Sequence, residues 1–347
     1  RNCIMKRYGY LYEKIYDLDN LRLAHKNAQK GKKHYKEVKK INKDPDKYLL
    51  QIQEMLKNKT YRTSKYTIFS KRCDDKDRVI YKLPYFPDRI VHHAILQVLE
   101  PIWKKTFIET TYSSIKGRGI HKAVDKIKND IKNDDVKYCL KLDISKFYPS
   151  VDHNILKNII GKKIKDKDVL SLLYSIIDSA PGIPIGNYLS QFLGNLYLTY
   201  LDHVMKEKYK CKYYYRYCDD IVIFCDNKEK LHFLLNEIKI YLEKELNLKL
   251  KNNYQIFPLS KRGLDFLGYV FYKTHTKVRK KIKERFIQSV SYIKKNYESI
   301  NKKHIVNSIM SYYGWLKHSN SKHLWDSYID NSIISLLEKE GLKRRLI

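Results

Sequence analysis

The segment YYYRYCDDIVIF, residues 213–224, decides how the rest of the chain is interpreted. Two short runs of aromatic and β-branched residues flank a Cys-Asp-Asp string at 218–220, which predicts two strands and a tight turn. Another predicted strand, KYCLKLDI at 137–144, ends at Asp143. Carboxylates beside a hydrophobic core are costly unless they are paired or bind a cation. Aspartate is also common in turns and at helix starts, but its recurrence at these strand ends favours a magnesium site.

The surrounding segments alternate between strand and helix patterns. Residues 66–86 predict a β-hairpin with a basic tip, and GLDFLGYVFY at 263–272 predicts one further strand. An amphipathic pattern over 189–204 predicts the clearest helix of the chain. In the helix that begins near Pro87, we expect one of His92 and His93 to be a core residue and the other to lie at the surface. Further helices are predicted over 20–60, after His121, from His153 to Pro181, over 228–245 and from 277 onward.

The chain is strongly basic, because 70 Lys or Arg residues against 38 Asp or Glu residues give a net charge of +32. Such a charge favours a polyanionic partner, since Lys and Arg release counterions when they meet phosphates. A solvated basic surface that reflects AT-rich coding is the alternative. An apolar content of 43% excludes intrinsic disorder as a class. The chain has no apolar run near the roughly 18 residues of a membrane span and no zinc-like cysteine spacing, so we expect a cytoplasmic protein with no membrane partner.

Three motifs in order make the chain resemble the reverse transcriptases. LDISKFYPSVDH at 142–153 is similar to the first palm motif, YCDD at 217–220 to the Tyr-x-Asp-Asp motif, and GLDFLGY at 263–269 to the primer grip. The resemblance implies an RNA-directed DNA polymerase with an α+β right-hand fold. It also implies three regions, namely N-terminal helices and fingers over 1–134, a palm over 135–273 with part of the fingers inserted at about 155–190, and a helical thumb over 274–347.

The string IGNYLSQ, residues 185–191, narrows the resemblance. Most reverse transcriptases carry Gln-Gly-x-x-x-Ser-Pro there, whereas this chain has Ile185 and Gln191 at the first and last positions. This pattern resembles reverse transcriptases of diversity-generating retroelements. That family implies error-prone, adenine-mutagenised copying of a template-repeat RNA into cDNA. It also implies a small basic accessory variability protein as partner, as a monomer or an oligomer.

Two alternatives to this interpretation stay open. One is another bacterial reverse transcriptase, of the group II intron-like or phage-defence type, although the Ile-Gly-x-x-x-Ser-Gln string disfavours the intron type. The other is a non-catalytic RNA-binding protein that keeps a polymerase-like shape. The presence of all three carboxylates disfavours it.

The resemblance also implies the composition of the site. Two Mg²⁺ ions, for which Mn²⁺ is the alternative, would be held by Asp143, the backbone of Ile144, Asp219 and Asp220. The side chains and backbone expected at the incoming dNTP are Lys71, Arg72, Arg78, Tyr148, Ile185, Gly186 and Gln191. Those expected at the template RNA or the primer and cDNA strand are Gly117, Arg118, Gly119, Tyr217, Leu267, Gly268 and Tyr269.

Some of these roles also have a physical basis, and some have a plain structural alternative. Arg78 matches the triphosphate-binding arginine, because a guanidinium offers a bidentate fork to phosphate; Lys71 or Arg72 is its companion. Tyr148 matches the aromatic gate against a ribose 2′-hydroxyl, with core packing as the alternative. Ile185 can offer only apolar contact, which discriminates poorly between similar shapes, so we expect reduced fidelity.

Two features are less specific. The glycines beside Arg118 either let the backbone approach template phosphates or simply form a turn. No general acid for the leaving group is assigned, because Asn253 stands where the family carries a lysine. Lys249 and Lys251 are the nearby substitutes.

Overall fold

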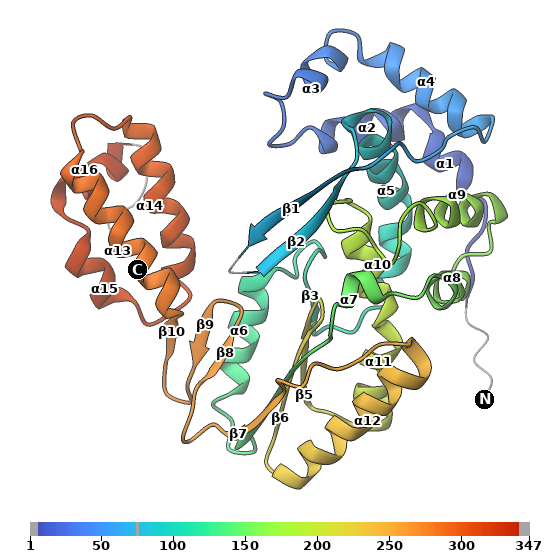
Figure 1. Cartoon of the computed structure of the whole chain (residues 1–347). Coiled ribbons are helices and arrows are strands. Elements are labelled where there is room, and N and C mark those ends of the chain that lie inside the picture. The colour runs from blue at the N-terminus through green and yellow to red at the C-terminus, as the bar shows by residue number, and fades with distance from the viewer. Residues whose placement is uncertain (1–5, 74–75, 340–347) are drawn as a thin grey trace.

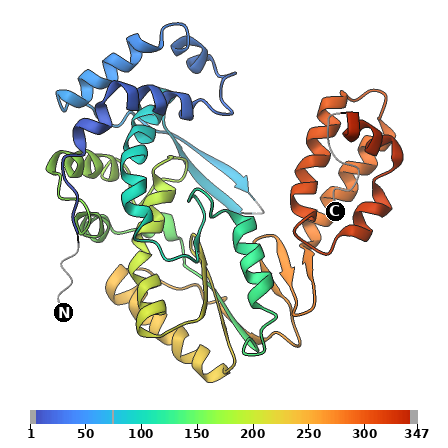
Figure 2. The ribbon, with the colours of Figure 1, turned by 180° about the vertical axis from the view of Figure 1, so that it is seen from behind.

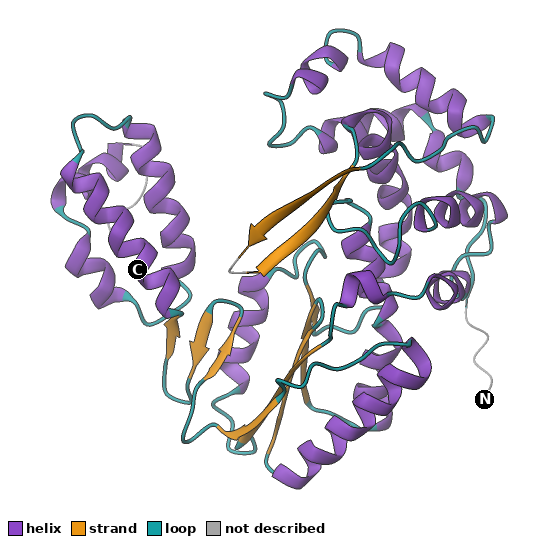
Figure 3. Cartoon of the chain, viewed as in Figure 1, coloured by secondary structure: helices purple, strands orange, loops and turns teal. Residues whose placement is uncertain are grey.

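A computed structural model describes residues 6–73 and 76–339. The expectations for 1–5, 74–75 and 340–347, and for the side chain of Lys76, lie outside the described residues. Figure 1 shows N-terminal helices with a projecting hairpin at the top, a sheet with its helices at the bottom and a helical bundle set to one side. In the part of the chain that the structure describes, strands occur in the hairpin and in two sheets in the lower part of the molecule (Figure 3). This arrangement confirms the α+β right-hand class, while the exact domain boundaries stay predictions.

The central sheet contains the three candidate acids. Its strand order is β3-β5-β6-β4-β7, and only the β3–β5 pair among these neighbours is parallel. The strands are β3 Thr111–Tyr112, β4 Tyr138–Asp143, β5 Tyr213–Tyr217, β6 Asp220–Cys225 and β7 Gln255–Pro258. Both strands predicted from residues 213–224, and the strand that ends at Asp143, are therefore confirmed.

Alternation along these strands gives the sheet two hydrophobic faces. Tyr214, Ile221 and Ile223 pack into the larger core with the N-terminal and palm helices. Tyr215 and Val222 belong to a second core, which includes side chains of α6 and of the C-terminal helices. Successive residues of a strand point to opposite faces, so an apolar run over β5 and β6 is what a sheet covered on both sides requires.

Helices cover the first face and build the upper part of the molecule. Aspartate side chains cap the backbone N–H groups at the start of several of them, as at Asp17, Asp44, Asp152 and Asp166. The helices are α1 Tyr12–Tyr16, α2 Leu18–Ala28, α3 Lys36–Ile41, α4 Pro45–Lys57, the π-turn η1 Tyr85–Arg89, α5 Ile90–Lys104, α7 Phe147–Ser150, α8 His153–Gly161, α9 Lys167–Ile177, α10 Ser190–Tyr197, α11 Thr199–His203, the π-turn η2 Val204–Lys208 and α12 Lys228–Leu246.

One expectation about α5 is wrong. His92 and His93 are both buried, although one was expected at the surface. The ring of His93 stacks on Tyr188, with ring centroids 3.7 Å apart. Residues of the loop before α10 thus cover a part of α5 that its own helical periodicity would leave exposed.

The second face of the sheet is covered by α6 Ile120–Asp130, which packs against β3 and β9 (Figure 2). The single strand expected over 263–272 is wrong in detail, because the chain reverses at Leu267 and Gly268, with φ of 53° and 85°. The result is a small antiparallel sheet of β8 Leu264–Phe266, β9 Tyr269–Phe271 and β10 Thr276–Val278. The thumb helices follow as α13 Lys280–Lys295, α14 Lys302–Leu316, α15 Lys322–Tyr328 and α16 Asn331–Lys339.

The predicted basic hairpin consists of β1 Thr67–Cys73 and β2 Lys76–Lys82, paired antiparallel. It projects from the N-terminal helices towards the space between the sheet and the thumb (Figure 1). Among the described residues, no helix combines the length and the apolar character that a bilayer crossing requires.

Candidate active site

The turn between β5 and β6 carries two of the three acids. Tyr217 and Asp220 are Cα partners at the ends of the two strands, so Cys218 and Asp219 alone make the connection. Cys218 has a φ of 54°, in the left-handed region that two-residue hairpin turns usually fill with glycine. The turn therefore stores backbone strain of about 1–3 kcal/mol, which surrounding contacts must hold in place.

The fold brings the three predicted acids together. Asp143 lies directly opposite Asp220 in the β4–β6 ladder. Asp219 shares a side-chain hydrogen bond with Asp143. Burial, together with the negative charges of Asp220 and Asp143, raises the pKa of Asp219 to about 7. Carboxylates held this close repel one another, so the cluster favours a proton or a cation between them.

A lysine contacts this cluster. Lys251 forms an ion pair with Asp143, and its backbone N–H donates to the Asp143 carbonyl at 3.0 Å. The segment around Lys251 runs beside β4, where Leu250 forms a bridge with Ile144, and the Ile144 side chain is fully buried. Asn253 is exposed in the following turn. Of the two substitutes expected for the missing lysine, Lys251 is thus the one that contacts an acid of the site.

The donor set suits a hard divalent cation, because crowded carboxylate oxygens are the ligands that Mg²⁺ prefers. The described residues do not include three or more acid, His or Cys side chains already arranged around a single point. The ion pair with Lys251 explains part of this, since it turns one oxygen of Asp143 towards an ammonium group. Lys251 therefore competes with a bound cation for one of the two carboxylate oxygens of Asp143.

Tyr148 lies beside the turn. Its hydroxyl is 3.8 Å from the Cys218 sulfur, and burial raises its pKa, with the Cys218 and Asp219 charges adding to the effect. A Cβ on Gly194 of α10 would be 3.5 Å from the Tyr148 ring, so α10 packs closely behind it. The ring is half-buried, which leaves both the predicted gate and partial core packing compatible with its position.

The loop that carries Ile185 connects this tyrosine to the hairpin. Ile183 N–H donates to the Tyr148 carbonyl at 2.8 Å, and Tyr81 N–H of β2 donates to the Ile185 carbonyl at 2.8 Å. Gly186 has a φ of 120°, and a Cβ there would lie 2.7 Å from the Tyr81 carbonyl oxygen. Glycine is therefore required where the loop meets the hairpin, and Ile185 lies half-buried at the same junction.

The register of the hairpin places the three side chains predicted to bind phosphate on two different faces. Lys71 lies opposite Arg78, and both belong to the face that also carries Ile80, whose side chain reaches towards Gly186. Arg72 pairs instead with Asp77, on the opposite face, because directly paired residues of a ladder share a face. Lys71 and Arg78 are exposed. The geometry thus favours Lys71 over Arg72 as the companion of Arg78.

The comparison with protein families decides the identity. A family model described as reverse transcriptase (RNA-dependent DNA polymerase) matches residues 69–271, which include most of the hairpin, the loop and all three acids. The chain belongs to the reverse transcriptase family.

Relatives of this reverse transcriptase are distant. Protein YkfC of Escherichia coli (strain K12) is 24% identical over 233 residues, covering 54% of this chain and 61% of the relative. The group II intron-encoded protein LtrA of Lactococcus lactis subsp. cremoris is 21% identical over 260 residues, covering 54% and 43%. The chain thus covers less than two thirds of the length of each of these relatives. Apo telomerase from Candida Tropicalis shares the fold with a TM-score of 0.53 and 13% identity over 81% of this chain and 59% of the other.

The residues expected at the template belong to the loop before α6, and Ser113 of this loop accepts a hydrogen bond from the Cys218 thiol of the turn. Gly117 is exposed with a φ of 81° and Gly119 is exposed at the start of α6. Arg118 between them donates to the Ile108 carbonyl at 2.7 Å, so its guanidinium contributes to the loop's own structure. Gln191 accepts from Ser114 of the same loop at 2.5 Å, which ties α10 to it. Their contacts with nucleic acid stay predictions.

The residues expected at the primer differ in exposure. Tyr217 is half-buried at the edge of the turn between β5 and β6. Gly268 is buried, and a Cβ there would be 2.6 Å from the Trp315 ring of the thumb. Tyr269 is fully buried, and its hydroxyl donates to the Trp315 carbonyl at 2.9 Å. Leu267 is the half-buried member of this turn. The Tyr269 ring is thus a core residue of the palm–thumb junction in this structure.

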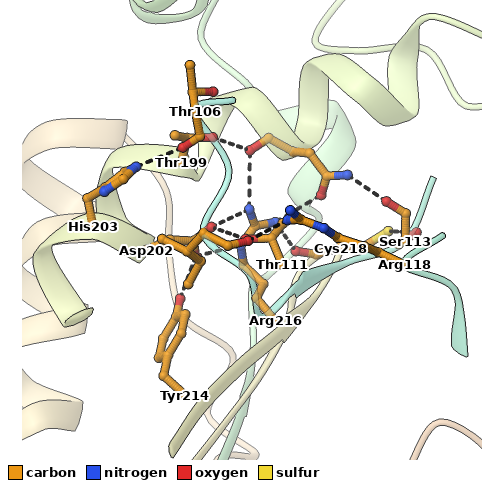
Figure 4. A network of polar contacts seen from close by, with 12 residues as sticks. Thr106, Thr111, Ser113, Arg118, Thr199, Asp202, His203, Tyr214, Arg216 and Cys218 are labelled. Carbon is orange, nitrogen blue, oxygen red and sulfur yellow. Dashed lines mark hydrogen bonds and ion pairs between the residues drawn. The ribbon is translucent and has the colours of Figure 1, made fainter. Parts of the chain in front are cut away.

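Sequence reasoning missed a buried pair beneath the turn, Asp202 of α11 and Arg216 of β5 (Figure 4). Both side chains are fully buried. A usable signal was present, because Arg216 follows Tyr214 by two residues on a strand whose alternate positions are core residues. A charged residue at such a position implies a buried partner of opposite charge.

Proposed function

We propose that the chain is an RNA-directed DNA polymerase that extends a primer or cDNA strand along an RNA template. The observation that carries this proposal is the meeting of Asp143, Asp219 and Asp220 at one half-buried turn in a reverse transcriptase fold. Nucleotidyl transfer needs a cluster of carboxylates rather than a nucleophilic side chain, because the attacking group belongs to the primer.

In this proposal the protein mainly orients its reactants. Asp143 and Asp219 would hold both magnesium ions, with Asp220 and the Ile144 backbone assisting. The ions would lower the pKa of the primer 3′-hydroxyl and neutralise charge on the leaving pyrophosphate. The turn contributes a fixed position for the carboxylates, so little reorganisation accompanies reaction. Before the substrates arrive, the ammonium group of Lys251 would neutralise the negative charge of Asp143.

The hairpin would bind the incoming nucleotide from the other side. Lys71 and Arg78 share one exposed face, and their charges complement a triphosphate. Tyr148 beside the turn would contact the sugar, where a ring excludes a 2′-hydroxyl by its volume. Ile185, bonded through its carbonyl to β2, would contact the nascent base pair.

Primer extension tests this proposal. An RNA template with an annealed DNA primer, dNTPs and Mg²⁺ is expected to yield extended product, and Mn²⁺ is expected to substitute. Asp219→Asn should abolish extension, because it removes a charge from the cluster with little change in volume. Asp226→Asn is the matched control, since Asp226 is exposed beyond the other end of β6. Its activity should equal that of the wild type.

A negative result has a clear meaning in this assay. If the wild type binds the RNA tightly but extends no primer, even with its cognate RNA and accessory protein present, the RNA-binding alternative replaces the polymerase. Equal loss of activity in Asp219→Asn and Asp226→Asn would also contradict the assignment of the site.

We further propose that this polymerase serves a diversity-generating retroelement, copying a template-repeat RNA with errors at adenines and working with a small basic accessory variability protein. The support is the Ile-Gly-x-x-x-Ser-Gln string and the position of Ile185 at the junction of loop and hairpin. An aliphatic side chain there cannot form the hydrogen bond by which a glutamine would penalise a mispair.

Sequencing of cDNA tests this finer proposal. Ile185→Gln is expected to lower misincorporation opposite template adenines by about tenfold, a difference of one hydrogen bond. Ile185→Leu keeps an apolar side chain and should retain the wild-type error spectrum. An unchanged spectrum in Ile185→Gln would reject the role of Ile185 but leave the polymerase proposal intact. A pair of imperfect repeats near the gene, differing at adenines, would identify template and target.

A further inference from the structure

The palm contains a fully buried charge network directly beneath the catalytic turn (Figure 4). The guanidinium of Arg216 forks onto Asp202, with Nε 2.7 Å from Oδ1 and Nη2 2.6 Å from Oδ2. Tyr214 donates to the first of these oxygens at 2.7 Å and Thr111 to the second at 2.9 Å. The carboxylate therefore accepts four hydrogen bonds, two on each oxygen, and is as well satisfied as a buried carboxylate can be.

The remaining donors of Arg216 reach towards the turn. Its Nη1 donates to the Cys218 carbonyl at 2.9 Å and to Asn195 Oδ1 at 3.1 Å, and its Nη2 donates to the Asn195 carbonyl at 3.2 Å. With the two bonds to Asp202, all five N–H donors of the guanidinium are used. Cys218 is the residue with positive φ that precedes Asp219. One N–H donor of Arg216 thus bonds to the strained residue that precedes Asp219.

A second path ties the same turn to the loop above it. Asn195 Nδ2 donates to the Ser113 carbonyl at 2.8 Å, and the Cys218 thiol donates to the Ser113 hydroxyl at 3.0 Å. Ser113 has a φ of 80°, so it too is held in the left-handed region. Cys218 and Ser113, both strained, are therefore connected to the same guanidinium, Cys218 directly and Ser113 through Asn195. Non-glycine residues keep a left-handed conformation only where several surrounding contacts hold them in it.

Stability of the fold alone does not account well for a buried ion pair such as Asp202–Arg216. A buried ion pair can often be replaced by apolar residues of similar size without loss of stability, because desolvation offsets the attraction. Burial disfavours the charge of Arg216, and the attraction of Asp202 outweighs it and raises the arginine's pKa. An apolar pair would offer no donor to the Cys218 carbonyl, whereas Arg216 donates to it.

We propose that Arg216, held in place by Asp202, is a positioning residue that fixes the Cys218 carbonyl and thereby the orientation of Asp219 towards the reacting atoms. The inference rests on the proposed polymerase function for its kinetic consequence. The proposal predicts that the turnover rate requires the forked guanidinium at position 216 and not only a positive charge. An ammonium group donates all its hydrogen bonds from a single nitrogen and cannot replace the fork.

Three variants separate positioning from folding. Arg216→Met combined with Asp202→Asn leaves no buried charge and keeps an acceptor for Tyr214. Arg216→Lys keeps the ion pair but cannot reach Asp202, Asn195 and Cys218 together. Tyr215→Phe is the matched control, because it removes a buried hydrogen bond to Asp130 from the same strand on the opposite face of the sheet.

Kinetics of the purified full chain give the first readout. For both Arg216 variants, kcat is expected to fall about 100-fold, because a displacement near 1 Å at the reacting centre has this effect. KM for the dNTP should change less than about threefold, since Lys71 and Arg78 are untouched. Tyr215→Phe should keep wild-type kcat. A folded double variant with wild-type kcat, or an Arg216→Lys variant as active as the wild type, would overturn the proposal.

Hydrogen exchange of the peptide that spans residues 217–221 gives a second readout that does not need activity. Exchange in this peptide is expected to accelerate about tenfold in the double variant relative to wild type and Tyr215→Phe, with peptides of α5 unchanged. Unaltered exchange at the turn would reject the positioning role. If the double variant shows this exchange difference but the wild type extends no primer, the polymerase proposal fails while the structural inference stands.

Discussion

The catalytic turn and the basic hairpin are the two halves of the proposed site, and they are held in opposite ways. The carboxylates are half-buried on a turn that the Arg216 network ties from below. Lys71 and Arg78 are exposed on a two-stranded hairpin. One half would therefore be fixed before substrate arrives, whereas the other half would gain its order from the phosphates that we propose it binds.

A short loop is the link between these halves. Ile183 bonds to Tyr148 beside the turn, and Ile185 bonds to Tyr81 of the hairpin, both through the backbone. A movement of the hairpin onto a nucleotide would therefore pull directly on the residue proposed to govern fidelity. We therefore expect substitutions in the turn to have large effects on kcat, and substitutions in the hairpin to have smaller effects, on KM.

The largest effect is expected at the fixed half. Asp143→Asn should lower kcat at least about 1,000-fold, because it removes a carboxylate that both ions are proposed to share and also the partner of Lys251. Steady-state primer extension over a range of Mg²⁺ concentrations measures this change. Full recovery of kcat at high Mg²⁺ would show that Asp143 contributes only to the affinity for the metal. The distinction between a fixed and an adaptable half would then weaken.

The hairpin variants should change KM instead. Arg78→Ala is expected to raise the KM for dNTPs about 10- to 100-fold, the range for losing a charge-assisted hydrogen bond to phosphate. Arg72→Ala is the matched control, because Arg72 lies on the opposite face beside Asp77 and should change KM less than about threefold. Equal effects of the two substitutions would mean that the hairpin twists on binding and that the register of the free protein does not define its ligands.

The fixed half could be predicted from the sequence and the adaptable half only in part. Asp143, Asp219 and Asp220 follow apolar strands, so their convergence could be inferred from strand ends alone. The choice of Lys71 over Arg72 depends on the register, and a one-residue slip would reverse it. The alternation of β5 indicates that Arg216 is buried and needs an acidic partner, but it does not identify that partner as Asp202, which lies on a helix 14 positions earlier. The burial of His93 and Tyr269 likewise depends on segments remote in sequence.

The loop between the halves gives a smaller prediction, in stability. Gly186→Ala should lower the free energy of unfolding by about 1–3 kcal/mol, because the new Cβ would meet the Tyr81 carbonyl in a backbone conformation that only glycine adopts easily. Gly119→Ala, with open space around its Cβ position, should lower it by less than about 1 kcal/mol, because its only cost is that alanine is a poorer N-cap of α6 than glycine. Urea denaturation of the two variants measures the difference. Equal stabilities would imply that the loop does not rest on the hairpin in solution.

The smallest effect is expected from the Tyr148 hydroxyl. Tyr148→Phe keeps the ring that is proposed to exclude ribonucleotides and loses only a contact of 3.8 Å to the Cys218 sulfur, which is weak at that distance. The kcat/KM values for dNTPs and rNTPs should both stay within about threefold of wild type. A tenfold or larger fall in kcat for both nucleotides would show that the turn is also held from above, through Cys218. The Arg216 network would then be one of two supports for Asp219, and the effect of removing it should shrink accordingly.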